Sequence, residues 1–523
     1  MTAILAFLAA SLSGALLFLG FPPFDMPTTT WVALVPLLCI VPRLRPAWAA
    51  VASFWCGVVF FLGVFAWGLS VESYTYLHHA LLSIAFSLYL SAIGATVSYI
   101  ARRKGILTAC LATPFVWVAG EYVKSNLPLI AYPWALLAHS QYQNIPLIQM
   151  ASLTGTYGIS FLLVWVNAAL AAIILPWMPR AGYPRGGPPE TIPLRLSFVL
   201  VAGGIVIVAG AFGFGRYQLA KPITGESVQI AAVQANIPQN EKWDPRNAKR
   251  IMQTYADLTS AAALQKPDLI VWPEAATPGT IANAANLRRY VLAIARQAKA
   301  YLLIGSTSHQ KYTGAQAKDL RYKNSAYFIA PMAKGHRLPR YDKIKLLAFA
   351  EYLPYAGLVP WALIQVPELG SYVPGKEKVV FEHPKFKFAA TICWENIFPD
   401  LVRQFVAHGA EVIVNITNEA WFGKTAAPRQ FLAISVFRAV ENQVYVVRCA
   451  NTGISCIIDS HGRIVKRLTD AKGNDLAVRG VLHGQVVPCK EKTFYTRTGD
   501  WLALVCLVVS SACVVIAWGS RRH

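Results

Sequence analysis

Long apolar stretches alternate with short polar segments over the first 220 residues, and one more apolar stretch closes the chain. A helix of about twenty apolar residues crosses the roughly 30 Å hydrocarbon core of a bilayer. We expect eight spans, of which the second and fifth are the weakest: Ala3–Gly20, Trp31–Val41, Ala49–Ser70, His79–Ile100, Ile106–Gly120, Tyr157–Trp177, Leu196–Gly215 and Trp501–Gly519. The pattern therefore predicts a seven-helix membrane region over residues 1–220 and a closing membrane helix within residues 497–523.

Residues 225–496 have a different pattern, in which short apolar runs alternate with amphipathic stretches. We expect strands at Ser227–Gln234, Asp268–Trp272, Tyr301–Gly305, Asn324–Ile329, in the run that ends at Cys393, and at Glu411–Thr417, Val444–Arg448, Ser455–Asp459 and Gly480–Val486. We expect helices at Arg246–Leu264, Leu287–Ala298, Asn396–His408 and Arg429–Val440. Continuously apolar strands that alternate with helices are typical of buried sheets with helices outside. The segment is therefore predicted to be an α/β layered domain.

Composition supports the membrane assignment, and the placement of charge gives an orientation. Charged residues make up 14% of the chain, against about 25% in soluble domains. Basic residues follow every second span: Arg43, Arg45, Arg102, Arg103, Lys104, Arg180, Arg185, Arg195, Arg521 and Arg522. The other short loops hold Asp25, Glu72 and Glu121, with Lys124 as their only cation. This asymmetry predicts that both termini are cytoplasmic and that residues 225–496 lie outside the cytoplasmic membrane.

The same placement of charge excludes two classes of function. The net charge of +22 could indicate nucleic acid, but much of it belongs to the loops that orient the spans. We therefore expect no nucleic-acid partner. Transporters normally carry ionisable residues at mid-membrane, and these spans carry almost none.

A long loop from Glu121 to Thr156 follows the fifth span and is rich in aromatic residues and proline, including Tyr132, Pro133 and Trp134. Tryptophan and tyrosine favour the lipid headgroup level, so the loop either lies there or packs against the outer domain.

Nine cysteines are present, but neither a CxxC pair nor a His/Cys cluster has metal-ligand spacing. We expect no metal and no other cofactor. Cys449 and Cys456 are close enough in sequence to meet across a hairpin, and the sequence alone does not decide whether they pair.

Cys393 stands where a strand-like run, Lys387–Ile392, gives way to a helix-like pattern. A cysteine at the amino end of a helix feels the positive end of the helix dipole, which lowers the thiol pKa and favours the nucleophilic thiolate. The alternative is that Cys393 is an ordinary buried thiol.

Two further residues follow apolar runs in a comparable way: Glu274 after Val271-Trp272-Pro273, and Lys343 after Tyr341-Asp342. A cysteine nucleophile needs a base to take its proton and a cation or donor to stabilise the oxyanion. Glu274 can be that base and Lys343 that cation. Either residue alone would more often be on the surface; together with Cys393 they indicate nucleophilic catalysis.

The order Glu274, Lys343, Cys393 resembles the nitrilase superfamily, which implies an α-β-β-α sandwich. With the membrane spans added, the chain resembles the apolipoprotein N-acyltransferase family. The resemblance covers nearly the whole chain and includes Phe21–Pro27, Tyr132–Trp134, Ser140–Gln141, Gly155–Gly158, Gln234–Gln239 with Trp243, Trp272–Glu274, Cys393–Glu395, Asn418–Gly423 and Asn451–Gly453.

The resemblance implies a multi-pass enzyme of the bacterial cytoplasmic (inner) membrane. Such an enzyme moves an acyl chain from a phospholipid to the α-amino group of a diacylglyceryl-cysteine at a lipoprotein N-terminus. By resemblance, Cys393 forms the thioester, Glu274 is the general base and Lys343 stabilises the oxyanion.

Glu351 and Glu395 match supporting glutamates of the family, with ordinary salt bridges as the alternative. Four aromatic residues would line the site for acyl chains or form a lid, with core packing as the alternative: Trp243, Trp394, Trp421 and Phe422.

The segment after Lys343 departs from the family pattern Lys-x-His-Leu-Val-Pro-Phe-Gly-Glu, because Lys345, Ala348 and Ala350 replace its His, Pro and Gly. Two milder departures are Trp394, where the family often has tyrosine, and Glu419, where aspartate is usual. These changes put substrate preference in doubt more than reaction type. The alternative function is a membrane-tethered amidase or nitrilase that uses the same three residues with water as the acceptor. The membrane spans favour the transferase.

Overall fold

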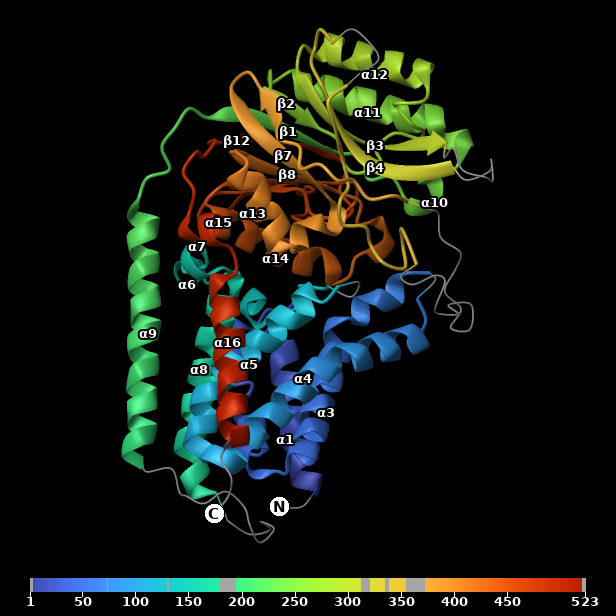
Figure 1. Cartoon of the computed structure of the whole chain (residues 1–523). Helices are drawn as coiled ribbons and strands as arrows, with labels where there is room; N and C mark the ends of the chain where they lie inside the picture. Colours follow the sequence, from blue (N-terminus) through green and yellow to red (C-terminus); the bar gives the residue numbers. More distant parts are fainter. Residues whose placement is uncertain are drawn as a thin grey trace. The chain divides into compact units, whose positions relative to one another are not determined.

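The computed structural model describes residues 3–72, 74–128, 131–178, 194–311, 320–333, 338–353 and 372–519. The chain divides into two compact units (Figure 1). One unit is helical and comprises Met1–Lys221 with Thr498–His523, and the other is an α/β unit over Pro222–Arg497.

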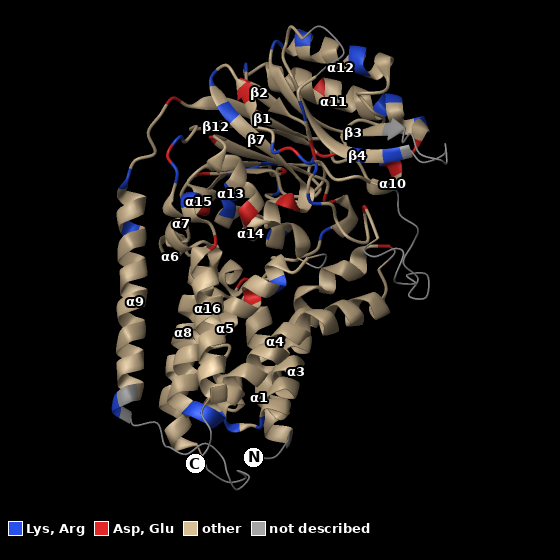
Figure 2. Ribbon diagram, in the orientation of Figure 1, with Lys and Arg blue, Asp and Glu red and all other residues tan. Residues whose placement is uncertain are grey.

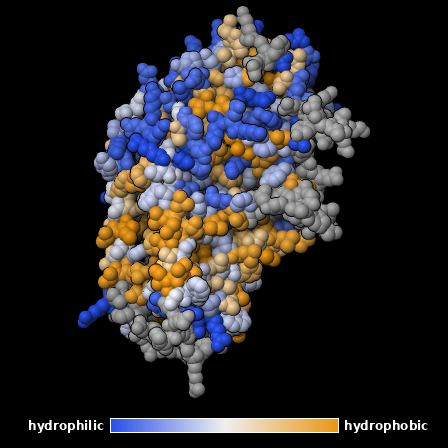
Figure 3. Space-filling model, viewed as in Figure 1, coloured by the Kyte–Doolittle hydropathy of each residue, from blue (hydrophilic) through white to orange (hydrophobic). Residues whose placement is uncertain are grey.

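The helical unit contains seven longer helices in the described part of the chain: α1 (Ala3–Leu19), α3 (Pro46–Val64), α4 (Tyr76–Lys104), α5 (Ile106–Asn126), α8 (Thr156–Ile174), α9 (Leu194–Ala220) and α16 (Trp501–Gly519). Among the described residues, six segments are long and apolar enough to cross a membrane, and Ile4–Leu19 is a shorter apolar helix. On the face drawn in Figure 3, hydrophobic side chains gather over this unit. Integral membrane character is confirmed, whereas the predicted count of eight spans is not.

The second predicted span is wrong as a continuous helix. Residues 27–43 form short turns instead, η1 (Pro27–Trp31), α2 (Val35–Leu38) and η2 (Val41–Arg43), each with a proline in its first turn. Proline lacks a backbone N–H and interrupts the helix.

Side chains of neighbouring helices bond the backbone groups that these breaks release. Asn167 accepts from the Leu34 N–H at 2.8 Å and donates to the Thr30 carbonyl at 3.0 Å. The Ser13 hydroxyl accepts from the Leu37 N–H at 3.0 Å. Irregular backbone within an apolar unit persists only with such partners.

Helix α5 continues to Asn126, so Glu121 and Lys124 lie on this helix and not in the predicted exterior loop. Both side chains are buried. Glu121 Oε1 accepts from the Leu137 N–H at 2.8 Å, and Lys124 Nζ donates to the Trp134 carbonyl at 2.7 Å. These bonds fasten the following loop to α5. Trp134 is buried against Tyr132 and Trp67 within the same unit, not exposed at headgroup level.

The α/β unit contains two six-stranded sheets. The first has the order β12-β1-β2-β3-β4-β5 and the second β11-β10-β9-β8-β7-β6. Their strands are β1 (Val228–Gln234), β2 (Leu269–Val271), β3 (Tyr301–Lys311), β4 (Leu320–Ile329), β5 (Arg340–Asp342), β6 (Phe381–His383), β7 (Phe386–Ile392), β8 (Val412–Thr417), β9 (Tyr445–Ala450), β10 (Cys456–Ile458), β11 (Ile464–Arg467) and β12 (Gly480–Val486). Strands β1, β2 and β3 are parallel in the first sheet, and β7, β8 and β9 are parallel in the second. The carboxyl ends of the parallel strands therefore lie at one edge of each sheet.

Helices cover the outer faces of the two sheets (Figure 1). They are α11 (Ala248–Ala263) and α12 (Ala285–Ala298) on the first sheet, and α13 (Pro399–Ala407) and α14 (Ala427–Asn442) on the second. The sheets face each other, since the Cys449 thiol on β9 lies 3.5 Å from the Val233 carbonyl on β1 and 3.3 Å from the Val271 carbonyl on β2. The predicted α-β-β-α sandwich is confirmed.

All nine cysteines are free, including Cys449 and Cys456. In the β9–β10 register Cys456 is opposite Arg448 and not Cys449. Because neighbouring strand residues point to opposite faces, the two thiols point away from each other.

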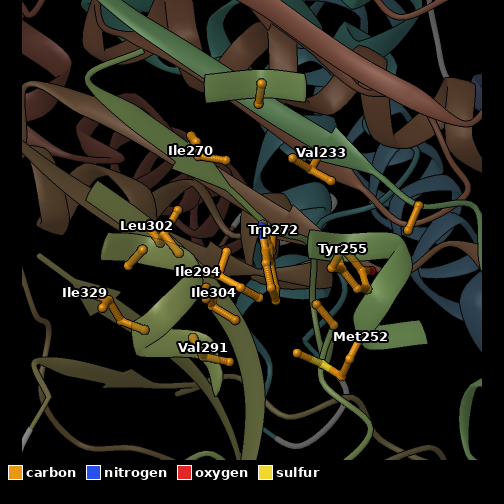
Figure 4. Close-up of a cluster of buried hydrophobic side chains, with 14 of the residues drawn as sticks. Val233, Met252, Tyr255, Ile270, Trp272, Val291, Ile294, Leu302, Ile304 and Ile329 are labelled. Carbon is orange, nitrogen blue, oxygen red and sulfur yellow. The ribbon is translucent and has the colours of Figure 1, made fainter. Parts of the chain in front are cut away.

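One hydrophobic core lies between the first sheet and its two helices (Figure 4). Trp272 is fully buried there and stacks on Tyr255 with ring centroids 4.7 Å apart. Its indole N–H donates to the Thr259 hydroxyl at 2.9 Å. Trp272 thereby anchors the end of β2, two residues before Glu274.

We predict that Trp272→Ala lowers the melting temperature of the purified full-length protein, because truncating a buried tryptophan costs about 3–5 kcal/mol. Leu264→Ala is the control, since Leu264 is 83% exposed and should change the melting temperature little. Equal melting temperatures for the two variants would contradict the anchoring role of Trp272.

Candidate active site

Glu274 lies just beyond the carboxyl end of β2, and β3 passes directly behind its turn. A Cβ on Gly305 would lie 2.3 Å from the Pro273 carbonyl oxygen, so only glycine permits this approach. The buried Glu274 carboxylate accepts from Asn324 Nδ2 at Oε1 (2.7 Å) and from the Asn418 N–H at Oε2 (2.9 Å). Its orientation is therefore fixed by two donors from separate elements.

Lys343 follows β5 and is 2% exposed. Two hydrogen bonds hold its backbone. The Lys343 N–H donates to the Asn324 carbonyl at 2.8 Å, and the Lys343 carbonyl accepts from the Gly375 N–H at 2.7 Å. Its Nζ lies 3.0 and 2.9 Å from the two oxygens of Glu351, and 3.6 Å from Glu274 Oε1. Burial alone lowers the pKa of Lys343, but the carboxylates of Glu351 and Glu274 raise it above its ordinary value. The side chain is therefore an ammonium.

Glu351 is the buried counter-ion of that ammonium, not a surface salt bridge. Its Oε1 also accepts from Asn324 Nδ2 at 3.2 Å, and its Oε2 from the Leu347 N–H at 2.7 Å. Asn324 thus bridges the carboxylates of Glu274 and Glu351. A buried charge pair is stable only when such further bonds satisfy its remaining oxygens.

Cys393 directly follows β7 and has a φ of +55°. This is a left-handed backbone conformation that residues other than glycine rarely adopt. The Asn415 amide holds this turn by donating to the carbonyls of Cys393 (3.1 Å) and Thr391 (3.2 Å). Behind Asn415 lies Arg448, which is ion-paired with Glu419 in the core. Cys393 thus follows the carboxyl end of β7 in the second sheet, as Glu274 follows that of β2 in the first, and the thiol interacts electrostatically with Glu274 and Lys343.

The predicted helix effect on Cys393 is wrong. Cys393–Ile397 forms a 3₁₀ turn, and α13 begins only at Pro399, so no α-helix starts at the cysteine. Burial raises the pKa of the Cys393 thiol and the Glu274 carboxylate raises it further, whereas Lys343 lowers it. The raised pKa favours the neutral thiol, so a nucleophilic role for Cys393 would require a base to take its proton.

Glu395 connects the cysteine turn to the segment after Lys343. Its fully buried carboxylate accepts from Tyr341 Oη (2.8 Å) and from the backbone N–H groups of Ile344 (2.6 Å), Lys345 (3.0 Å) and Ile392 (2.9 Å). Of the two alternatives left by the sequence, the ordinary salt bridge does not describe it, because its partners are neutral donors.

The predicted aromatic residues fall into two groups. Trp394 is buried, donates to the Lys345 carbonyl at 2.6 Å and packs edge-on against Phe398. Trp243 and Trp421 are each 49% exposed, and Phe422 is half-buried. Trp394 thus has a packing role, and the other three leave apolar surface accessible.

Sequence reasoning missed four polar residues of the site: Lys242, Asn324, Asn415 and Asn418. Asn418 lies in a segment that carried the family resemblance, which was the available signal, and Lys242 directly precedes Trp243, another residue of that resemblance. Asn324 and Asn415 lie on predicted strands, where an isolated asparagine is not distinctive.

Comparisons with known proteins cover both units. The family model described as "Apolipoprotein N-acyltransferase N-terminal domain" matches residues 13–169, and that of "Carbon-nitrogen hydrolase" matches residues 229–485. The apolipoprotein N-acyltransferase of Geobacter metallireducens is 36% identical, over 99% of this chain and 95% of its own. That of Chlorobaculum tepidum is 26% identical, over 98% and 96%. A solved amidase of the nitrilase superfamily from Nesterenkonia is 18% identical with a TM-score of 0.38, covering 54% of this chain and 98% of its own.

We predict that Glu395→Gln lowers the melting temperature of the full-length protein, because an amide nitrogen would face buried donors that now share a carboxylate. Leaving a buried donor unsatisfied costs about 1–3 kcal/mol. Glu382→Gln is the matched control, since the Glu382 side chain is 76% exposed. A Glu395→Gln protein as stable as the control would contradict the connecting role.

Proposed function

Because the chain belongs to the apolipoprotein N-acyltransferase family, we propose that it acylates lipoproteins through a thioester on Cys393. Glu274 is the general base and Lys343 stabilises the oxyanion. The observation that carries these roles is the buried Lys343 ammonium, held by Glu351 and Glu274, beside a neutral thiol on a strained turn. We assign catalysis to residues 225–496, between the helical region 1–220 and the closing helix within 497–523.

In the first half-reaction the acyl donor is a phospholipid. The Glu274 carboxylate takes the Cys393 proton as the sulfur attacks the ester carbonyl, and the resulting oxyanion accepts a hydrogen bond from the Lys343 ammonium. When the intermediate collapses, Glu274 returns the proton to the departing alcohol oxygen, and a lysophospholipid leaves. A positioned base and an oxyanion donor each contribute on the order of 10²–10⁴ in rate.

In the second half-reaction the acceptor is the neutral α-amine of a diacylglyceryl-cysteine. The amine attacks the thioester, Glu274 takes one of its protons, and the collapsing intermediate releases an amide. The proton then returns to the Cys393 sulfur. An amine attacks a thioester far more readily than an oxygen ester, which suits cysteine to this step.

Exposed apolar side chains suit the lipid substrates. We assign Trp243, Trp421 and Phe422 to contact with acyl chains, because they retain accessible apolar surface near residues of the site. Lys345, which replaces the family's histidine, is exposed and lies 5.3 Å from the Phe398 ring centroid. We assign it to substrate preference, outside the bond-making steps.

An amidase with water as the acceptor is the less favoured alternative. Relatives that match nearly the whole chain carry the acyltransferase name. A hydrolase of small soluble amides gains little from membrane helices, whereas both substrates of the transferase are lipids.

We propose that both termini are cytoplasmic and that the α/β unit lies outside the cytoplasmic membrane. Lysine and arginine gather at the end of the helical unit where α4 ends and α9 begins (Figure 2). This is the side that the positive-inside rule makes cytoplasmic. Arg180, Arg185, Arg521 and Arg522, which contributed to the sequence prediction, lie outside the described residues. Glu121 and Lys124 are not counted as charges of an exterior loop, because both are buried on α5.

Cys393→Ala should abolish acyl-enzyme formation. Glu274→Gln and Lys343→Ala should each slow it by about 10²–10⁴-fold, the contribution of a base or an oxyanion donor. The measurement is lysophospholipid release in a single turnover, with Lys249→Ala as the control because Lys249 is exposed on α11. Near-normal acylation by Lys343→Ala would reassign its role, with Lys345 as the first candidate.

Enzyme given phospholipid alone should accumulate acyl-Cys393 and release lysophospholipid in near-stoichiometric amount, because the thioester waits for an amine. Addition of a diacylglyceryl-cysteine peptide should then discharge the adduct as an N-acyl amide, detected by mass spectrometry. Continuous release of free fatty acid without peptide would instead establish the hydrolase.

A topology reporter fused after Lys104 should report the cytoplasm, and one inserted in the exposed turn at Gly473 should report the exterior. We expect these signals because lysine and arginine gather at the end of the helical unit where α4 ends and α9 begins. The opposite pair of signals would overturn the orientation and, with it, access to secreted lipoproteins.

A further inference from the structure

A second buried lysine lies beside the proposed base. In the described part of the α/β unit, Lys242 and Lys343 are the only buried lysines, at 4% and 2% exposure. Lys242 is the last residue of α10 (Gln239–Lys242). Its Nζ donates to the backbone carbonyl of Glu274 at 2.9 Å. Two buried ammonium groups therefore contact Glu274, one at its carboxylate and one at its main chain.

No carboxylate among the described residues lies within ion-pair distance of Lys242, in contrast to Lys343 with Glu351. Its charge interacts over a longer range with the Glu274 carboxylate and the Cys393 thiol. Burial lowers the pKa of Lys242 to about 8, and these two groups oppose that decrease. Most of the lysine is therefore still cationic at neutral pH. A buried cation without a counter-ion of its own is costly, which indicates that its position serves the site.

Helix α10 holds Glu274 at a second point. Gln239 Oε1 accepts from Asn418 Nδ2 at 2.9 Å, and the Asn418 N–H donates to Glu274 Oε2 at 2.9 Å. The backbone and the carboxylate of Glu274 are thus both tied to α10. The next residue is the exposed Trp243, whose ring centroid lies 5.9 Å from Lys242 Nζ.

We propose that Lys242 is a positioning residue for acylation of Cys393: its ammonium fixes the main chain of Glu274, and α10 fixes the Glu274 carboxylate through Gln239 and Asn418. The proposal rests on the proposed role of Glu274 as the base. Proton transfer from the thiol depends on where the Glu274 carboxylate is held, and a hydrogen bond from a charged donor is stronger than one from a neutral donor. A side chain that merely fills the space would not supply that bond.

The test compares Lys242→Met with Lys242→Arg, with Lys249→Met as the matched control because Lys249 is exposed on α11. Full-length proteins in detergent receive phospholipid, and single-turnover lysophospholipid release is measured against phospholipid concentration. Lys242→Met should be at least about tenfold slower at saturating phospholipid, the effect of one hydrogen bond from a charged group. Its half-saturating phospholipid concentration should be unchanged. Lys242→Arg should restore most of the rate, and Lys249→Met should match the wild type.

Two results would overturn the proposal. One is wild-type acylation in Lys242→Met. The other is acylation that is as slow in Lys242→Arg as in Lys242→Met, which assigns Lys242 to packing alone. If Lys242→Met does not fold, Lys242→Gln supports or refutes the proposal by the same two readouts. Glu274→Gln separates the proposed role of Glu274 as the base from the proposed role of Lys242. Acylation retained in Glu274→Gln would refute the base assignment. Acylation lost in Glu274→Gln but normal in Lys242→Met would refute only the role of Lys242.

Discussion

A buried ammonium needs carboxylates within hydrogen-bonding range, and much of the site's construction follows from how the fold supplies them to Lys343. Glu351 contacts its Nζ through both oxygens, and Glu274 lies slightly farther away. Truncating one partner of such a pair leaves an uncompensated buried charge and costs about 3–5 kcal/mol. The members of this cluster, Lys343, Glu351, Glu274 and Asn324, therefore depend on one another. Asn324 bridges the two carboxylates, and the Lys343 backbone is hydrogen-bonded to Asn324 and Gly375.

In the proposed mechanism, the same cluster lets a cysteine without a low pKa act as a nucleophile. The Cys393 turn is held in a strained conformation by Asn415, which leads back to the buried Arg448–Glu419 pair. Burial keeps the thiol neutral, and the proposed base lies beside the cation that would stabilise the oxyanion. In the proposed mechanism, Glu274 and Lys343 couple proton removal to charge stabilisation. Such coupling suits an enzyme whose thioester must persist until a second lipid arrives.

Much of the fold could be predicted because its signals are local. Apolar runs located the six described helices that are long and apolar enough to cross a membrane, and β-α alternation located most of the described strands to within a few residues. The second span failed because prolines break it and Asn167 and Ser13 bond its freed backbone groups, which are contacts distant in sequence. The short strand Arg340–Asp342 was missed because its stability comes from pairing with β4. The helix at Cys393 was placed too early, since the pattern does not distinguish a 3₁₀ turn from the first turn of α13. Lys242 was missed because burial of a lysine is decided by the tertiary fold.

The central claim is that Cys393 rests as a neutral thiol and is activated only by proton transfer within the cluster. It is tested most directly by the ultraviolet difference absorbance of the thiolate between the wild-type protein and Cys393→Ala, titrated over pH in detergent. The account predicts no thiolate difference at neutral pH and a signal only in strongly alkaline solution, because burial and Glu274 both raise the pKa of this thiol. A thiolate difference already present at neutral pH would contradict it and would show a cysteine activated in advance of substrate.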